Sequence, residues 1–181
     1  MMTLDVDTTS HPLVHSEFLL KLRNLYSAEN YCFRRIPGLL KKIPGNRLHQ
    51  ILTEHLPIIV ERMRRLEKIF DEINVKTGGA VCRTFKSLIS KAGNSIYQIK
   101  LKHNHNTSEL LSTLIEISIY RCSIYNFLKD WITNNIQKPF LIHALGMCVI
   151  EEDRFFRSLL KIRNYQSSGE LNFGSSILQP A

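Results

Sequence analysis

The chain has 181 residues, a length that fits one domain with a substantial hydrophobic core. It is 44% hydrophobic and 22% charged, which excludes a mainly disordered protein. The N-terminus lacks the basic start and the apolar run of a secretory signal, and the longest uncharged apolar run, 140–150, is too short to span a bilayer. We therefore expect a cytoplasmic protein with no membrane association.

The basic charge of the chain permits an acidic partner. Lys and Arg number 24 against 16 Asp and Glu, so the net charge is +8. The basic residues are scattered through segments with helical periodicity, and neither a basic tail nor a basic strand interleaved with aromatic residues is present. A solvated basic surface is the favoured interpretation, and a module that binds DNA or another acidic partner is an alternative.

Hydrophobic residues recur every three or four positions in five segments, which predicts five helices. A flexible leader is expected over 1–15, helices at about 16–42, 46–74, 80–101, 107–134 and 139–165, and a polar tail over 166–181. Ser16 is a candidate N-cap, Pro139 suits a first helical position, and Pro57 should bend the second helix. Long helices with short connections favour an all-α antiparallel bundle that forms one domain over 16–165.

Charged residues interrupt the hydrophobic seams of four of these helices. Glu29, Arg62, Arg121 and Glu152 each occupy a position where the periodicity calls for an apolar residue. A buried charge is costly unless it is paired or bound to a metal ion. One interruption on each of four helices suggests that the four side chains share one site.

Several short motifs follow one another in a fixed order. The segments LRNLYSAENYCFRRIPGLLKK, EHLPIIVERMRRLEKIFDEI and CRTFKSLI begin at residues 22, 54 and 82. The matching positions are Leu25, Tyr26, Ala28, Glu29 and Pro37, then His55, Leu56, Arg65, Leu66, Glu67 and Phe70, then Cys82, Leu88 and Ile89, then Tyr120, Tyr125, Leu128 and Trp131, and finally Glu151 and Glu152. In these motifs the chain resembles the ferritin-like proteins of the YciE/YciF type, a family of bacterial stress-associated helical proteins of unknown function.

The resemblance implies a ferritin-like four-helix bundle with an additional helix, a homodimer and a stress-linked role, with no known substrate. Ferritin-like bundles commonly hold two iron or manganese ions through Glu and Glu-x-x-His ligands. This chain keeps Glu29, Glu151 and Glu152 at vestigial ligand positions. It departs from the family at Arg62 and Arg121, whose guanidinium groups cannot ligate a metal ion.

We therefore interpret the chain as a non-enzymatic protein without a cofactor, in which a di-metal centre has been replaced by a core charge network of Glu29, Arg62, Arg121 and Glu152. Bidentate pairing of Arg with carboxylates suits such a network. In one alternative the two Arg side chains extend to the surface, while the Glu side chains bind water or backbone. In another, iron or manganese is bound for oxidase or peroxidase chemistry. The sequence identifies no catalytic residue and no small-molecule substrate.

Overall fold

The computed structural model describes residues 12–43, 45–79, 82–101 and 107–167. They form five helices: α1 (Pro12–Leu40), α2 (Arg47–Glu72), α3 (Arg83–Leu101), α4 (Ser108–Asn135) and α5 (Pro139–Ser167). No strand occurs in these four ranges, so the all-α prediction is confirmed. None of the five helices has a stretch long and apolar enough to cross a membrane.

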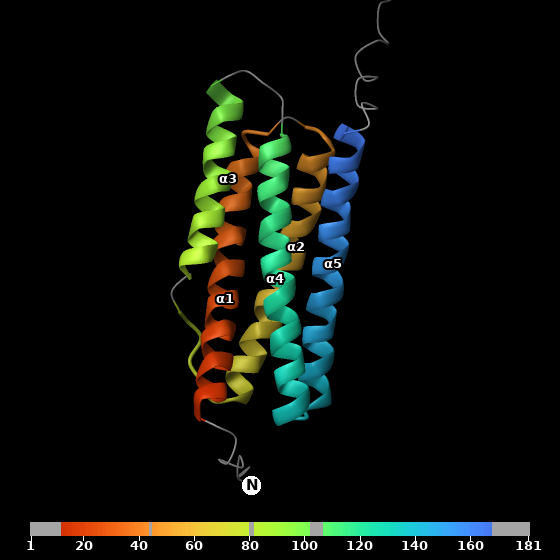
Figure 1. Ribbon diagram of the computed structural model, residues 1–181. Coiled ribbons are helices and arrows are strands. Elements are labelled where there is room, and N and C mark those ends of the chain that lie inside the picture. Colours follow the sequence, from red (N-terminus) through yellow and green to blue (C-terminus); the bar gives the residue numbers. More distant parts are fainter. Residues whose placement is uncertain (1–11, 44, 80–81, 102–106, 168–181) are drawn as a thin grey trace, which may run out of the picture.

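Four long helices form the bundle, and α3 is added to one side of it. Helix α1 packs against α2 and α4, and α5 packs against α2 and α4, so the four helices close a ring in which neighbours run in opposite directions (Figure 1). The shorter α3 packs on α4 and covers only the upper part of the bundle in this view (Figure 1). The expected additional helix is thus α3.

Helix α1 begins earlier than the sequence predicted. It starts at Pro12, inside the expected leader, and Ser16 lies within the helix instead of capping it. Proline suits the first helical position, because its missing N–H would have no partner there and its φ is already helical. Residues 1–11 of the expected leader and 168–181 of the expected tail lie outside the described residues.

The loop between α2 and α3 returns along α1. Ser27 of α1 donates a hydrogen bond to the Gly79 carbonyl at 2.9 Å. Gly79 has a φ of +155°, and a Cβ there would lie 2.7 Å from the Cβ of Arg23. Glycine is therefore required both by the backbone conformation and by the close approach to α1.

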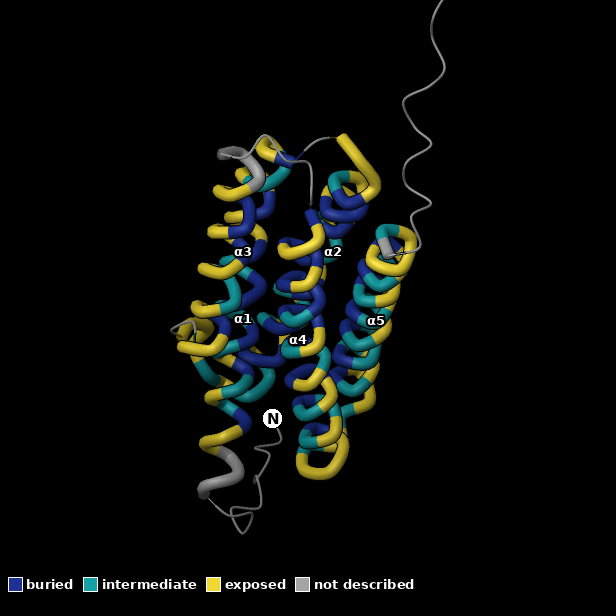
Figure 2. Tube along the Cα trace, turned by 45° about the horizontal axis from the view of Figure 1, so that its top comes forward, coloured by how far each residue is buried: buried dark blue, intermediate teal, exposed yellow. Residues whose placement is uncertain are grey.

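The hydrophobic core consists of two clusters stacked along the bundle. The lower cluster, at the end where α1 begins, includes Phe18, Leu22, Leu25, Leu66, Ile69, Phe70, Ile124, Leu128, Leu141 and Leu145. The upper cluster includes Cys32, Ile36, Leu48, Leu52, Ile59, Phe85, Ile96, Leu110, Leu114, Phe155 and Leu159. Buried positions recur on the inward sides of the helices along both clusters (Figure 2). Helix α3 contributes to the upper cluster alone.

Candidate functional site

The four charges that interrupt the seams meet between the two clusters. Glu29 on α1, Arg62 on α2 and Glu152 on α5 are fully buried, and Arg121 on α4 is 1% exposed. On each helix the charged residue lies three or four positions from apolar residues of both clusters, so helical geometry places it at the boundary between them. We call these four residues the ionic layer.

Glu152 is held from two neighbouring helices. Arg121 places Nη2 2.9 Å from Oε1 and 2.7 Å from Oε2 of Glu152, and Arg62 donates from Nη1 to Oε2. The hydroxyl of Ser118, three residues before Arg121 on α4, donates to Oε1 at 2.5 Å. Both carboxylate oxygens of Glu152 are therefore occupied by donors from the protein.

Glu29 has a similar set of donors. The hydroxyl of Tyr125 donates to its Oε1 at 2.9 Å, and Arg121 donates from Nη1 to its Oε2 at 3.2 Å. Arg62 Nη1 also approaches Oε1 of Glu29 at 3.4 Å. Each of the two guanidinium groups thus contacts both buried carboxylates, and the four formal charges sum to zero.

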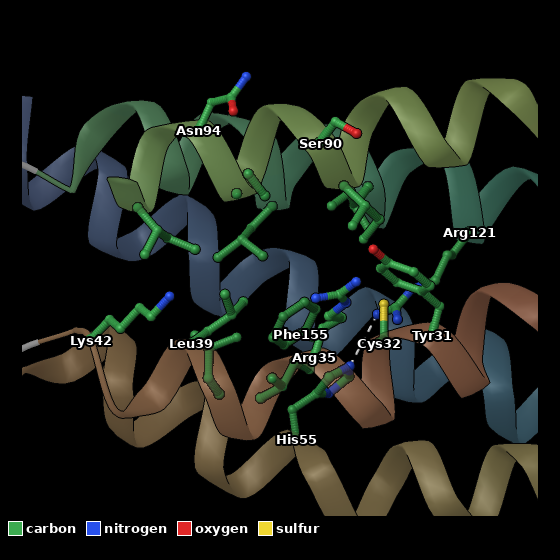
Figure 3. Close-up of a pocket in the computed structure, with 18 residues that line it drawn as sticks. Tyr31, Cys32, Arg35, Leu39, Lys42, His55, Ser90, Asn94, Arg121 and Phe155 are labelled. Carbon is green, nitrogen blue, oxygen red and sulfur yellow. Dashed lines mark hydrogen bonds between the residues drawn. The ribbon is translucent and has the colours of Figure 1, made fainter. Parts of the chain in front are cut away.

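His55 extends the ionic layer toward the upper cluster. Its Nε2 lies 3.0 Å from Arg121 Nη2, and its ring stacks on Phe155 at a centroid distance of 3.7 Å (Figure 3). Because a guanidinium can only donate, Nε2 of His55 must accept, which requires the neutral imidazole. Burial and the charges of Arg121 and Arg62 together hold the pKa of His55 well below its usual value.

Glu151 lies at the edge of the ionic layer and has a different partner. Arg65 donates to its Oε2 at 2.7 Å, and Arg62 Nε is 3.4 Å from the same oxygen. Arg65 also lies 3.8 Å from the Cys148 thiol. Glu151 therefore links the buried layer to a half-buried ion pair at the contact of α2 and α5.

Mutual neutralisation keeps the buried groups ionised. Burial alone would raise the pKa of Glu152, but Arg121 and Arg62 outweigh it and the pKa lies below its usual value. Burial alone would lower the pKa of Arg121, but Glu152 and Glu29 outweigh it and the pKa lies well above its usual value. Glu152 and its partners Arg62 and Arg121 thus form buried ion pairs at physiological pH.

The donor set does not fit a di-metal centre. All four oxygens of Glu29 and Glu152 accept hydrogen bonds, and the space between them is occupied by guanidinium groups that repel cations. Within the described residues, no group of three or more His, Cys, Asp or Glu side chains is arranged to hold a metal ion. Two buried nitrogens, Arg62 Nη2 and Arg121 Nε, have no hydrogen-bond partner among these residues.

The sequence analysis assigned no network role to Ser118, Tyr125, His55 or Arg65. A signal for all four was present: Ser118 and Tyr125 lie three before and four after Arg121, and His55 and Arg65 lie seven before and three after Arg62. These spacings place each on the same helical face as the charged residue. Arg65 is partly exposed and pairs with Glu151, the residue beside Glu152.

Four solved chains are similar to this chain, and two of them show the extent of the likeness. The E. coli stress protein YciF has 18% sequence identity and a TM-score of 0.76, over 87% of this chain and 99% of that one. YcfI from Rhodopseudomonas palustris has 21% identity and a TM-score of 0.72, over 88% of this chain and 97% of that one. At these identities the likeness shows the fold, which is the ferritin-like fold of YciF. No curated protein sequence matches the chain.

The resemblance inferred from the short motifs is confirmed by the family comparison. The part of the chain that matches the family begins two residues after the start of α1 and ends five residues before the end of α5. It therefore includes all four residues of the ionic layer. The family described as a domain of unknown function, DUF892, matches residues 14–162, and the chain belongs to this family.

Proposed function

We propose that the chain is a non-catalytic, stress-linked bundle protein in which the ionic layer replaces the di-metal centre of ferritin-like relatives. The observation that carries this proposal is the complete use of the Glu29 and Glu152 carboxylates by protein donors. Iron or manganese chemistry needs carboxylate oxygens that face a shared cation. Here those oxygens face Arg62 and Arg121, and the layer joins four helices in place of a metal ion.

Metal analysis tests directly whether the ionic layer has replaced the di-metal centre. Chain purified without chelator is incubated anaerobically with Fe²⁺ or Mn²⁺, dialysed and analysed by mass spectrometry of the metal. We expect less than one equivalent per chain. Iron or manganese retained at one or more equivalents would contradict the proposal and support an oxidase or peroxidase function.

A gain of binding gives the sharper form of the same test. The double variant Arg62→His/Arg121→Glu places two potential ligands beside Glu29 and Glu152 and removes both guanidinium groups. We expect this variant to retain metal after dialysis. The matched control Arg64→His/Lys68→Glu introduces the same two residue types in place of two basic residues on the exposed side of α2, and it should not retain metal.

A stress-linked role is supported by likeness to the E. coli stress protein YciF. We expect the abundance of the chain to rise when cells meet oxidative, osmotic or acid stress, as measured by quantitative proteomics. Constant abundance under all three conditions would count against this part of the proposal, while leaving the metal analysis unaffected.

A further inference from the structure

A cavity of about 370 Å³ lies between α1 and α3, above the ionic layer. Figure 3 shows Arg35 and Leu39 of α1 and Lys42 of the turn after it along one side, with Ser90 and Asn94 of α3 across from them. The cavity exists because α3 packs chiefly on α4 and carries small residues on the side toward α1. A Cβ added at Gly93 would meet no atom within 4 Å. We call this space the α1–α3 cavity.

The dimensions of the α1–α3 cavity suit one unbranched chain. Its lining on α1 extends from Tyr31 to Leu39, a rise of ~12 Å along the helix axis. A volume of about 370 Å³ spread over this length makes the cavity long and narrow, a shape that suits one unbranched chain.

Apolar side chains form most of the wall, and the mouth is basic. Ile36, Leu39 and Leu114 are among the aliphatic side chains that line the cavity, and no Asp or Glu lines it. Arg35 is exposed on α1, and Lys42 is exposed in the turn that follows the end of α1 at Leu40. Neither side chain forms an ion pair with any described residue, and the guanidinium carbon of Arg35 lies 5.1 Å from the centre of the Tyr31 ring. The field at the mouth therefore favours an anion.

The charges at the two ends of the cavity determine which part of an anionic ligand would lie inside and which part at the mouth. At the inner end, the charge of Arg121 is already neutralised by Glu29 and Glu152, and His55 is neutral. A second anion buried there would have no unpaired cation to offset its desolvation. At the mouth, two solvated cations are free to pair with a head group while an apolar tail occupies the interior.

We propose that the α1–α3 cavity binds an anionic single-chain amphiphile, with its head group at the mouth that Arg35 and Lys42 form and its apolar tail directed toward Phe155. Fatty carboxylates and alkyl phosphates share this chemistry. The inference rests on the cavity and its rim, so it holds whether or not the ionic layer excludes metal.

Calorimetric titration of the full chain tests the proposal. The probes are decanoate, decyl phosphate and the neutral control decanol, each below its micellar concentration. We expect saturable binding of at least one anionic probe at one site per chain, and decanol roughly tenfold weaker or undetectable. The two anionic probes distinguish a carboxylate head from a phosphate head. Absence of saturable binding by both, or decanol binding as tight as the better anion, would overturn the proposal.

Variants locate the site. Ala92→Phe and Gly93→Leu place side chains toward the cavity from α3, and Arg35→Gln/Lys42→Gln removes the two rim charges. We expect roughly tenfold weaker binding in the filled and in the neutralised variants, each checked for an unchanged circular-dichroism spectrum. The matched control Arg64→Gln/Lys68→Gln, which lies outside the cavity lining, should bind as the parent does. Unchanged binding in both filled variants would place the ligand elsewhere.

Discussion

Arg121 is the residue on which the ionic layer depends most. Its guanidinium contacts Glu29, Glu152 and His55, and the residue is 1% exposed. A buried ion pair contributes little compared with a well-packed apolar substitute, but losing one partner leaves the other charge uncompensated. Single and double substitutions should therefore behave very differently at this site.

We expect Arg121→Leu to destabilise the chain by roughly 3–5 kcal/mol in urea unfolding followed by circular dichroism. Glu152→Gln added to Arg121→Leu should recover much of that loss, because the uncompensated carboxylate is gone. The double-mutant cycle should then show coupling between the two positions. Additive effects of the two single substitutions would show that the contact carries no interaction energy and would weaken the ion-pair interpretation.

His55 should make stability fall as the pH drops below about 6.5, the usual pKa of histidine in an unfolded chain. Its pKa in the folded protein is lowered by burial and by Arg121 and Arg62, so the unfolded state takes up a proton that the folded state does not. The expected loss is about 1.4 kcal/mol between pH 7.5 and 5.5, in a window above carboxylate titration. It is measured by urea unfolding at each pH.

Two variants test this pH dependence: one replaces the histidine that contacts the ionic layer, and the other replaces an exposed histidine. His55→Gln keeps an acceptor for Arg121 but removes the titrating group, so the fall in stability between pH 7.5 and 5.5 should shrink by that amount. His143→Gln, at an exposed position of α5, should leave the fall unchanged. A fall of the same size in His55→Gln would show that another group is responsible.

At the scale of the helix, α2 shows how packing overrides local preference. Pro57 lies inside α2, where it removes one backbone donor, yet the helix continues to Glu72. Inward-facing residues on both sides of the proline, including Leu52, Ile59 and Leu66, are almost completely buried. Burial of this face stabilises the helix more than one missing hydrogen bond destabilises it.

Pro57→Ala should therefore stabilise the chain by ~1 kcal/mol, since Pro57 is exposed and alanine restores the missing donor. The measurement is the midpoint of thermal unfolding, with Pro37→Ala as a parallel substitution at an exposed proline in α1. Marked destabilisation by Pro57→Ala would mean that packing requires the local backbone geometry that proline imposes.

Most helix boundaries could be read from the sequence, because an amphipathic helix repeats its apolar residues every three or four positions. The start of α1 could not, since residues 12–15 give no strong periodic signal and Ser16 resembles a cap. The candidate site was predictable to a similar degree. Charges on apolar seams indicate burial, but which donor meets which oxygen depends on how four helices align along the bundle.

At the scale of the whole molecule, the α1–α3 cavity had no sequence signature. It depends on the distance between two helices that are far apart in the chain, and small residues such as Ala92 and Gly93 are common on helices that pack closely.

The exposed surface of the bundle is easier to interpret than the cavity. Large apolar residues remain exposed on three long helices, among them Leu20 at 59%, Ile119 at 53% and Ile150 at 46%.

We expect a homodimer that covers part of this exposed apolar surface. Light scattering at micromolar concentration should give a particle of twice the chain mass of 21.0 kDa. Replacement of Leu20 or Ile150 by Glu should shift the particle toward the monomer if the residue lies in the contact, with Lys161→Glu as a control at an exposed position of α5. A 21.0 kDa particle for the parent chain would contradict the expectation.

The position of the ionic layer between two apolar clusters also affects which misfolded states are available. If one helix slid by a single turn, ~5.4 Å, its Arg or Glu would enter a cluster of Leu, Ile and Phe, while an apolar residue would face the remaining charges. Helices with uniform apolar seams would tolerate such slippage far better. The ionic layer therefore fixes the axial register of the four helices that contribute to it. It disfavours compact states in which these helices form but pack in the wrong register.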